Sequence, residues 1–340
     1  MPSAIEQPGF HIPTVDISAY LADPLSAEAQ HVVGAVRLAC TTSGFFQLVG
    51  HGIQPAVRNA MFSGAKALFK LSFAEKKALK RAGNRGYEVM GSQALQDGTL
   101  PDLKEGYYIG EDSIPFDAGR SYRPFMEPNI WPSEDQLPSS AFKNPMNEYY
   151  AHVAALNQTV MEIVADALPY GSGVFDGLKQ QPVAASMRLL HYPPQRTNDE
   201  KQLGAGAHTD FGITTLLLTD GHPGLEVLNH STGQWVAVPP NEDAYVVNVG
   251  EYVIPSVLIL GHLHLGSMLQ QITGGYFKSN VHRVLNLGDE DRYSVPYFFD
   301  GCLDARLARL DGKDLGKVLT VEEHMTERFA TTYGRGEKKD

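Results

Sequence analysis

The sequence predicts a mainly β protein, an antiparallel barrel or sandwich with helices beside it. From residue 185 onward, short β-rich segments recur at regular spacing and are separated by Gly, Pro, Asn and Asp. Before that point, apolar residues recur at helical spacing. A hydrophobic content of 43% over 340 residues is enough for a substantial core. The expected strands are MRLLHY, TTLLLT, GLEVL, WVAV, AYVVNV, SNVHRVLN and YSVPYFF.

The elements before and after this β region are predicted from the same patterns. Short strands are expected at Ile12 and after Gly44, and Gly and Pro cluster without a sustained period over residues 81–145, which favours loops and short strands. The expected helices cover residues 26–42, 55–69 with a charged end at 75–77, 147–168, and a last stretch from about 320. We divide the chain into an N-terminal helical and mixed region (1–145), a β core (146–310) and a C-terminal helix and tail (311–340).

Charge and hydropathy argue against two classes of partner. The chain carries 28 basic and 39 acidic residues, a net charge of −11, without a basic run able to follow a phosphate backbone. The N-terminus lacks a signal-peptide pattern, and the longest strongly apolar run, residues 252–260, is too short to span a bilayer. We therefore expect a cytoplasmic protein with no nucleic-acid or membrane partner, and the oligomeric state is left open.

Two histidines and an aspartate form a candidate metal site. His208 and Asp210 stand two apart at the start of a β segment, so on a strand they would project to one face. Such a pair alone is more often the polar end of an ordinary strand. His282, on a later predicted strand, completes a set of two histidines and one carboxylate, which leaves open positions on Fe(II). A structural zinc site would instead use four protein ligands.

Arg292 and Ser294 are candidates for binding a carboxylate. They are again an i, i+2 pair on a predicted strand, ten residues after His282. A guanidinium presents a planar fork that suits a carboxylate, and the serine hydroxyl adds a donor. Taken alone, Arg292 would be read as a surface residue of a hairpin. Beside the metal motif, the pair could hold the far end of a dicarboxylate whose other end chelates the metal.

These motifs resemble those of a known enzyme family. His208-x-Asp210, His282 and Arg292-x-Ser294, with GFFQLVGHGI and LLHYPPQ, are similar to the 2-oxoglutarate-dependent non-haem iron oxygenases of the isopenicillin N synthase-like group. The resemblance runs from Ile12 to about Asp300. It implies a double-stranded β-helix, or jelly-roll, core over 146–310 with N-terminal helices. NRGY, DLKEGYYIG and MRLLHYP are similar to fungal-type members, among them thymine 7-hydroxylase.

The resemblance also implies cofactors and a reaction. Fe(II) would be held by His208, Asp210 and His282, and 2-oxoglutarate would chelate the iron and be held by Arg292, Ser294 and Tyr192, with dioxygen at the last position. Leu190 stands where many plant members have an asparagine. A 2-oxoglutarate-dependent dioxygenase of this kind hydroxylates or desaturates a small molecule through an Fe(IV)-oxo intermediate.

Four residues are expected to line the substrate pocket. Arg188 alternates with Leu190 and Tyr192 on one strand face, so it would point inward with Tyr192. By resemblance to thymine 7-hydroxylase, Asn84, Arg188, Phe211 and Phe298 line the pocket, although a loop cap for Asn84 and core packing for the two aromatic residues are the alternatives. Phe211 replaces a tyrosine of that enzyme, which favours a planar, oxygenated molecule such as a secondary metabolite over thymine.

Residues 252–267 depart from the family pattern. They separate NVGE from MLQ, whereas the family ordinarily reads NVGD directly before MLQ. Glu-Tyr-Val can be encoded with GTATGT, a typical start of a short intron, and Ser267 can supply the closing AG. Excision between these points keeps the reading frame and rebuilds Asp before Met268. We therefore hypothesise a retained intron. A genuine insertion that acts as an apolar lid or partner-binding segment is the alternative.

Three functional classes remain open on the sequence. The first is the 2-oxoglutarate-dependent oxygenase. The second is an oxidase of the same fold that needs no 2-oxoglutarate, and the third is a non-catalytic or inactivated form disrupted by residues 252–267. Release of succinate that depends on 2-oxoglutarate distinguishes the first class from the others.

Overall fold

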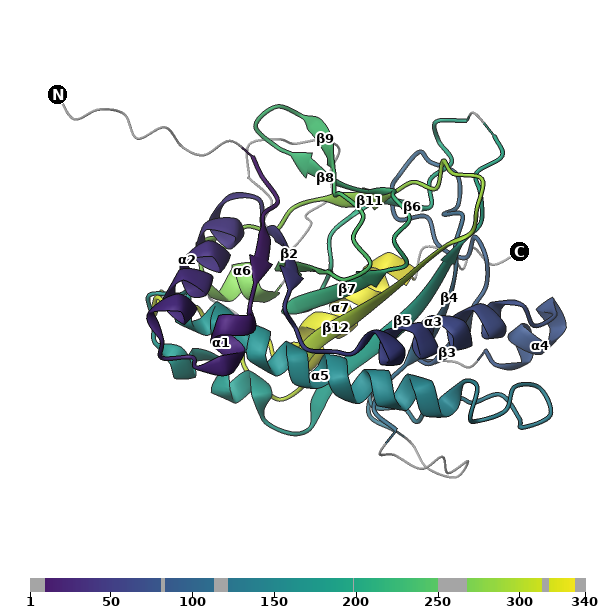
Figure 1. Ribbon diagram of the computed structural model, residues 1–340, viewed down its shortest axis with the longest axis horizontal. Helices are drawn as coiled ribbons and strands as arrows, with labels where there is room; N and C mark the ends of the chain where they lie inside the picture. Colours follow the sequence, from purple (N-terminus) through teal and green to yellow (C-terminus); the bar gives the residue numbers. More distant parts are fainter. Residues whose placement is uncertain are drawn as a thin grey trace.

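Two β-sheets and a set of flanking helices make up the computed structural model (Figure 1). It describes residues 10–80, 83–112, 122–197, 199–249, 268–313 and 318–333, so the insertion at 252–267 lies outside the described residues. In the described part, the large sheet has the order β1-β2-β10-β7-β12-β5-β4-β3 and the small sheet the order β6-β11-β8-β9.

The strands of the large sheet are β1 (Thr14–Asp16), β2 (Phe45–Val49), β10 (Tyr245–Val249), β7 (Thr214–Thr219), β12 (Arg292–Cys302), β5 (Val183–Tyr192), β4 (Glu105–Ile109) and β3 (Gly86–Glu88). Those of the small sheet are β6 (Ala205–His208), β11 (His282–Val284), β8 (Leu225–Asn229) and β9 (Gln234–Ala237). The helices are α1 (Ser18–Ala22), α2 (Ala27–Thr42), α3 (Pro55–Phe69), α4 (Phe73–Ala78), α5 (Lys143–Asp166), α6 (Met268–Ile272) and α7 (Val321–Tyr333), with a 3-10 helix, η1 (Ser172–Lys179).

Strand alternation divides the interior into two apolar layers. On β5, Leu190 and Tyr192 belong to a cluster that also contains Val227 and Val284 of the small sheet. On the strands of the large sheet, the residues that alternate with these belong to the main apolar cluster, which also contains residues of the helices. Successive strand side chains point to opposite faces, so one layer lies between the sheets and the other under the helices. The first layer is the interior of the jelly roll.

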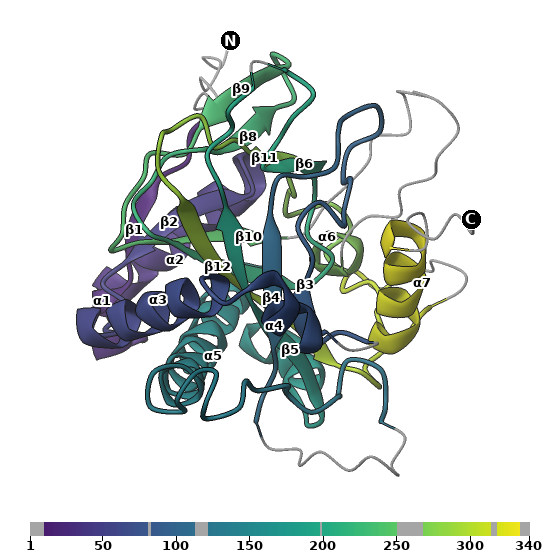
Figure 2. The same ribbon diagram turned by 90° about the vertical axis from the view of Figure 1, so that its right-hand side faces the viewer.

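The helices cover the outer face of the large sheet. Figure 1 shows the long α5 running along this sheet with α2 and α3 beside it, and α5 contacts β7 and β12. Figure 2 shows α7 at the side of the molecule away from α1 and α2. Helix α7 contacts β12, the strand that carries Arg292 and Ser294.

Most predicted elements are present, with shifted boundaries. The helix expected at 147–168 begins four residues earlier, and Ser26 caps the one expected at 26–42 by accepting a hydrogen bond from the Ala29 amide. The charged end of the second predicted helix is a separate helix, α4. A capping box between Ser72 and Glu75 starts it, because the backbone amides of both residues find side-chain acceptors there.

Close backbone packing joins β10 to the segment after α6. The Val249 amide donates to the Gly44 carbonyl at 3.3 Å. Gly44 has φ +70°, and a Cβ at this position would lie 2.1 Å from the Lys278 carbonyl oxygen. Only glycine fits both the conformation and the space. The end of β10 and the segment that follows α6 therefore both lie against Gly44.

Candidate metal and cosubstrate site

Pairing between β6 and β11 brings the two predicted histidine ligands together. His208 and His282 are direct partners in the antiparallel register, and their ring centroids lie 4.3 Å apart. Strand β6 ends at His208, so Asp210 lies just beyond the strand rather than on it as expected. Even so, its Oδ1 is 3.9 Å from His208 Nε2 and 3.8 Å from His282 Nε2.

Neighbouring groups orient these three side chains. The Nδ1 atom of His208 lies 2.7 Å from the Gly206 carbonyl oxygen, which directs its Nε2 toward the other two residues. The Asn248 side chain donates to Asp210 Oδ2 at 2.9 Å. One ligand atom from each of the three residues lies within 4.8 Å of the others. Hydrogen bonds of this kind from outside the ligand set fix the orientation of metal ligands.

The electrostatics of the cluster suit a cation. Burial, followed by the neighbouring His282, lowers the pKa of His208 to about 3, so its imidazole is neutral and can act as a ligand. Burial acts to raise the pKa of Asp210, but the two imidazoles and the Asn248 hydrogen bond hold that pKa below its ordinary value. The cluster therefore offers imidazole nitrogens and an ionised carboxylate, the donor set of an open Fe(II) site.

The guanidinium of Arg292 is buried and only partly satisfied. Arg292 is 1% exposed, and its Nε and Nη1 atoms have no hydrogen-bond partner among the described residues. Strand pairing places Arg292 opposite Tyr192, whose ring centroid is 5.1 Å from the guanidinium carbon. A buried cation with unused donors is costly unless an anion is bound. Arg292 therefore fits one carboxylate of 2-oxoglutarate.

A cavity leads from this end of β12 to the metal candidates. Ser294 and Tyr192 line it together with His208, Asp210 and His282, and Leu190 contributes an apolar wall where an asparagine was the family expectation. Lys104 also lines it, as the buried partner of Asp102 in an ion pair.

A second cavity meets the first at the metal candidates. The two share Leu95, Arg188, His208, Asp210 and Phe298 in their walls. Asn84 and Phe211 line the second cavity, so it contains all four residues expected at the substrate pocket.

Arg188 is buried in this wall together with its partners. It forms an ion pair with Glu88 and donates to Gln93 Oε1 at 2.8 Å, and its guanidinium lies 4.8 Å from the Tyr108 ring centroid. These contacts offset the cost of an inward arginine, which the sequence alone left unexplained.

Sequence reasoning missed Asn248, Lys104 and Asp300 at the site. Asp300 was detectable, because it continues the alternation that runs from Arg292 and Ser294 to Phe298 on the same face of β12. Asn248 contacts Asp210 through tertiary packing of β10, for which the sequence contains no local signal.

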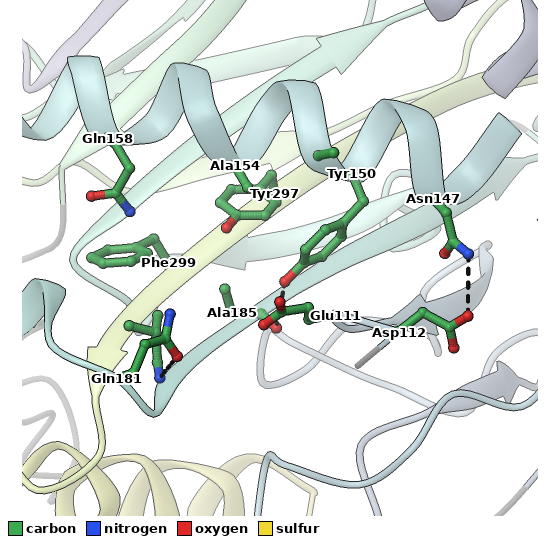
Figure 3. A pocket seen from close by; sticks show the side chains of 12 residues that line it. Glu111, Asp112, Asn147, Tyr150, Ala154, Gln158, Gln181, Ala185, Tyr297 and Phe299 are labelled. Carbon is green, nitrogen blue, oxygen red and sulfur yellow. Dashed lines mark hydrogen bonds between the residues drawn. The ribbon is translucent and has the colours of Figure 1, made fainter. Parts of the chain in front are cut away.

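A cavity larger than these two lies elsewhere in the described part of the chain. A hollow of about 460 Å³ lies between α5 and the outer face of β5 and β12, as Figure 3 shows. Tyr297 and Phe299 line it, and they point away from Ser294 and Phe298 because they have the opposite parity on β12. It is also bounded by Asp112, directly before residues outside the described part. We assign no chemistry to it.

Comparisons with known proteins agree with this fold. Residues 12–134 match the family described as non-haem dioxygenase in morphine synthesis N-terminal, and residues 184–301 match the 2OG-Fe(II) oxygenase superfamily. A 2-oxoglutarate-dependent dioxygenase of Monascus ruber, citB, is 49% identical over 333 residues, covering 95% of this chain and 96% of that protein. Clavatol oxidase claD of Penicillium crustosum is 39% identical over 349 residues, covering 97% and 98%.

Solved structures show the same architecture. The crystal structure of the full-length thymine 7-hydroxylase of Neurospora crassa in complex with alpha-KG has a TM-score of 0.77 and 27% identity, covering 96% of this chain and 98% of that chain. The predicted jelly-roll fold with flanking helices is confirmed. No helix in the described part of the chain is long and apolar enough to cross a membrane.

The fold and the paired histidine strands define a non-haem iron oxygenase, and the chain belongs to the 2OG-Fe(II) oxygenase superfamily. It is a 2-oxoglutarate-dependent dioxygenase whose cofactors are Fe(II), 2-oxoglutarate and dioxygen.

Proposed function

We propose that His208, Asp210 and His282 hold Fe(II) and that Arg292, Ser294 and Tyr192 hold 2-oxoglutarate. The observation that carries this assignment is the buried guanidinium of Arg292, which has unused donors and stands opposite Tyr192, while Tyr192 and Ser294 line a cavity together with the His–Asp–His cluster. A dicarboxylate that chelates a metal at one end and pairs with a guanidinium at the other suits these groups.

The side chains have distinct tasks in the reaction. With its cofactors bound, the site converts 2-oxoglutarate and dioxygen into succinate and carbon dioxide, and the remaining oxygen atom oxidises the substrate. Arg292 pairs with the far carboxylate, and Ser294 adds a hydrogen bond. Asn248 keeps Asp210 turned toward the histidines. Leu190 and Leu217 exclude water from the cosubstrate cavity.

The substrate that we propose is a small, planar, oxygenated molecule of secondary metabolism, which the enzyme hydroxylates or desaturates. Asn84, Arg188, Phe211 and Phe298 combine aromatic surface with polar groups in one cavity wall beside the metal candidates. Two comparisons support this size and shape: one relative is named clavatol oxidase, and the Neurospora thymine 7-hydroxylase has been crystallised with thymine. A cytoplasmic location and the absence of nucleic-acid partners stay predictions from the sequence.

The experiment follows succinate release and oxygen uptake by the Fe(II)-loaded protein, with clavatol and thymine as separate probes. We expect succinate only when 2-oxoglutarate is present, and a larger stimulation by clavatol than by thymine because Phe211 offers no hydroxyl. Oxygen uptake without 2-oxoglutarate would identify the oxidase instead. Stimulation by thymine alone would overturn the proposed substrate class while leaving the cosubstrate assignment intact.

A further inference from the structure

Asp300 places a carboxyl group in the wall of the substrate-side cavity. It lies on β12 with the same parity as Ser294 and Phe298, and it is 6% exposed. The structure gives its side chain no hydrogen bond or ion pair within the described ranges. A buried carboxyl group without a donor is costly and points to a partner that is supplied by a ligand.

Two arginines near this cavity donate hydrogen bonds to groups other than Asp300. Arg85 acts on Asp300 through its charge, but its Nη1 and Nη2 atoms donate to the carbonyl oxygens of Asn84 at 2.7 Å and Phe125 at 2.9 Å, and its Nε has no partner among the described residues. Arg188 pairs with Glu88. Burial therefore dominates, and it raises the pKa of Asp300 to about 7. In either protonation state the carboxyl group keeps an oxygen that can accept a hydrogen bond.

The chain leaves room for this carboxyl group. A Cβ added at Gly212 would lie 2.8 Å from Asp300 Oδ1 and 2.9 Å from the Phe299 carbonyl oxygen. Gly212 directly follows Phe211 and lines the same cavity. Any larger residue at this position would displace either the β12 backbone or the Asp300 side chain.

The rest of the cavity wall favours a donor on an aromatic ring. The Phe211 and Phe329 rings make an edge contact, with centroids 5.9 Å apart, and Phe298 lines the same space. These faces suit a planar ring. The charge of Arg188 in this wall is paired with Glu88. A hydroxyl group on an aromatic ring combines a planar ring with a donor that Asp300 can accept in either protonation state.

We propose that Asp300 is a specificity-determining residue that accepts a hydrogen bond from an aromatic hydroxyl of the substrate and so positions the ring beside the metal site. This inference rests on the proposed function and deepens it by naming a phenolic substrate class. A hydrogen bond to a carboxylate is strong enough to change affinity by about tenfold or more.

The test uses two probes of nearly equal shape, 2,4-dihydroxyacetophenone and 2,4-dimethylacetophenone. Their affinities are measured by anaerobic calorimetry on the protein with Fe(II) and 2-oxoglutarate, for the wild type, Asp300→Leu and Asp300→Asn. The control is Asp304→Asn, because Asp304 is an exposed neighbour that pairs with Arg123. We expect the wild type and the control to prefer the dihydroxy probe at least tenfold, Asp300→Leu to lose the preference to within about twofold, and Asp300→Asn to be intermediate.

A preference that survives in Asp300→Leu, or that is absent in the wild type, overturns the inference. If Asp300 had a purely structural role, its replacement would weaken the binding of both probes equally, and the ratio of their affinities would not change. If Asp300→Leu does not fold, the ratio is measured in Asp300→Asn instead. The visible band of the Fe(II) and 2-oxoglutarate complex is recorded in parallel. Absence of the band would refute the proposed metal site. The calorimetric ratio of the two probes would still show whether Asp300 binds the hydroxyl group.

Discussion

At the scale of single residues, the buried guanidinium of Arg292 has the clearest expected effect. Arg292→Met removes a buried cation whose Nε and Nη1 atoms have no hydrogen-bond partner among the described residues. We expect affinity for 2-oxoglutarate to fall by about 100-fold, because charge-assisted hydrogen bonds contribute roughly 1.5–3 kcal/mol each, with little change in stability. A titration of the visible Fe(II) and 2-oxoglutarate band measures the loss. Arg309→Met, at a partly exposed ion pair with Asp311, is the control and should bind normally.

The raised pKa of Asp300 implies that the free energy of unfolding depends on pH. The pKa of this group is raised to about 7 in the folded chain from an ordinary value of 3.8. The folded state therefore binds the proton more tightly, and the group lowers the free energy of unfolding as pH rises from about 4 to 7. Asp300→Asn removes this effect, so above pH 7 the variant should be more stable than wild type by about 4 kcal/mol.

Denaturant unfolding of the metal-free protein at pH 4.5 and 8 checks this prediction, with the exposed Asp135→Asn as the control. The stability gain of Asp300→Asn should shrink toward the lower pH. An equal gain at both values would show that Asp300 is ionised throughout or already paired.

The sequence pattern identified the candidate metal ligands, but not all of the residues that contact them. His208, Asp210 and His282 could be recognised because few residue types bind Fe(II) and their spacing is restricted. Arg292 and Ser294 were recognisable by their shared strand face. Asn248 and Lys104 were not, because their contacts depend on how β10 and the chain before β4 pack against other elements.

At the scale of elements, strand pairing brings the candidate metal ligands together, and α7 lines the cavity proposed for the substrate. The register of β6 and β11 places the two histidines opposite each other, whereas α7 contributes Met325 and Phe329 to the second cavity only. Helix α7 therefore lines only the cavity proposed for the substrate, and its removal should leave the proposed cosubstrate binding intact.

Truncation after Thr320 tests this separation. We expect the shortened chain to retain the Fe(II) and 2-oxoglutarate band, because no residue of α7 lines the cosubstrate cavity. It should bind aromatic probes roughly tenfold more weakly, since Phe329 no longer covers Phe211. A C-terminal truncated form of the Neurospora thymine 7-hydroxylase has been crystallised. Loss of the band with a folded protein would contradict the assignment, and Phe329→Ala is the milder variant.

Element types followed from periodicity, but their ends did not. The helix expected from 147 begins at Lys143, and β6 stops at His208, because capping and pairing partners decide where an element ends. The separate α4 could have been predicted from Ser72 and Glu75, which form the S-x-x-E pattern of a capping box.

At the scale of the whole molecule, residues 252–267 distinguish this sequence from the family pattern. The chain on both sides is in the main apolar cluster, with Val249 and Met268 fully buried. Gly44 contacts both Val249 and the backbone at Lys278, so the end of β10 lies close to the segment that follows α6. The retained intron stays a hypothesis from the sequence.

Deletion of residues 252–267 with Glu251→Asp is expected to preserve or increase both stability and Fe(II) affinity. Thermal unfolding and the visible-band titration compare it with the full chain, and sequencing of spliced transcripts should find the shorter message. A transcript that always retains these codons, together with loss of activity in the deletion, would establish a genuine functional insertion.

The most direct test of the central assignment is anaerobic addition of Fe(II) and 2-oxoglutarate to the full chain while the weak visible charge-transfer band is recorded. We predict that the band forms, disappears in His282→Ala and persists in His152→Ala, an exposed histidine on α5. A band that survives in His282→Ala, or one that never forms in either the full chain or the chain without residues 252–267, would contradict a metal site at His208, Asp210 and His282.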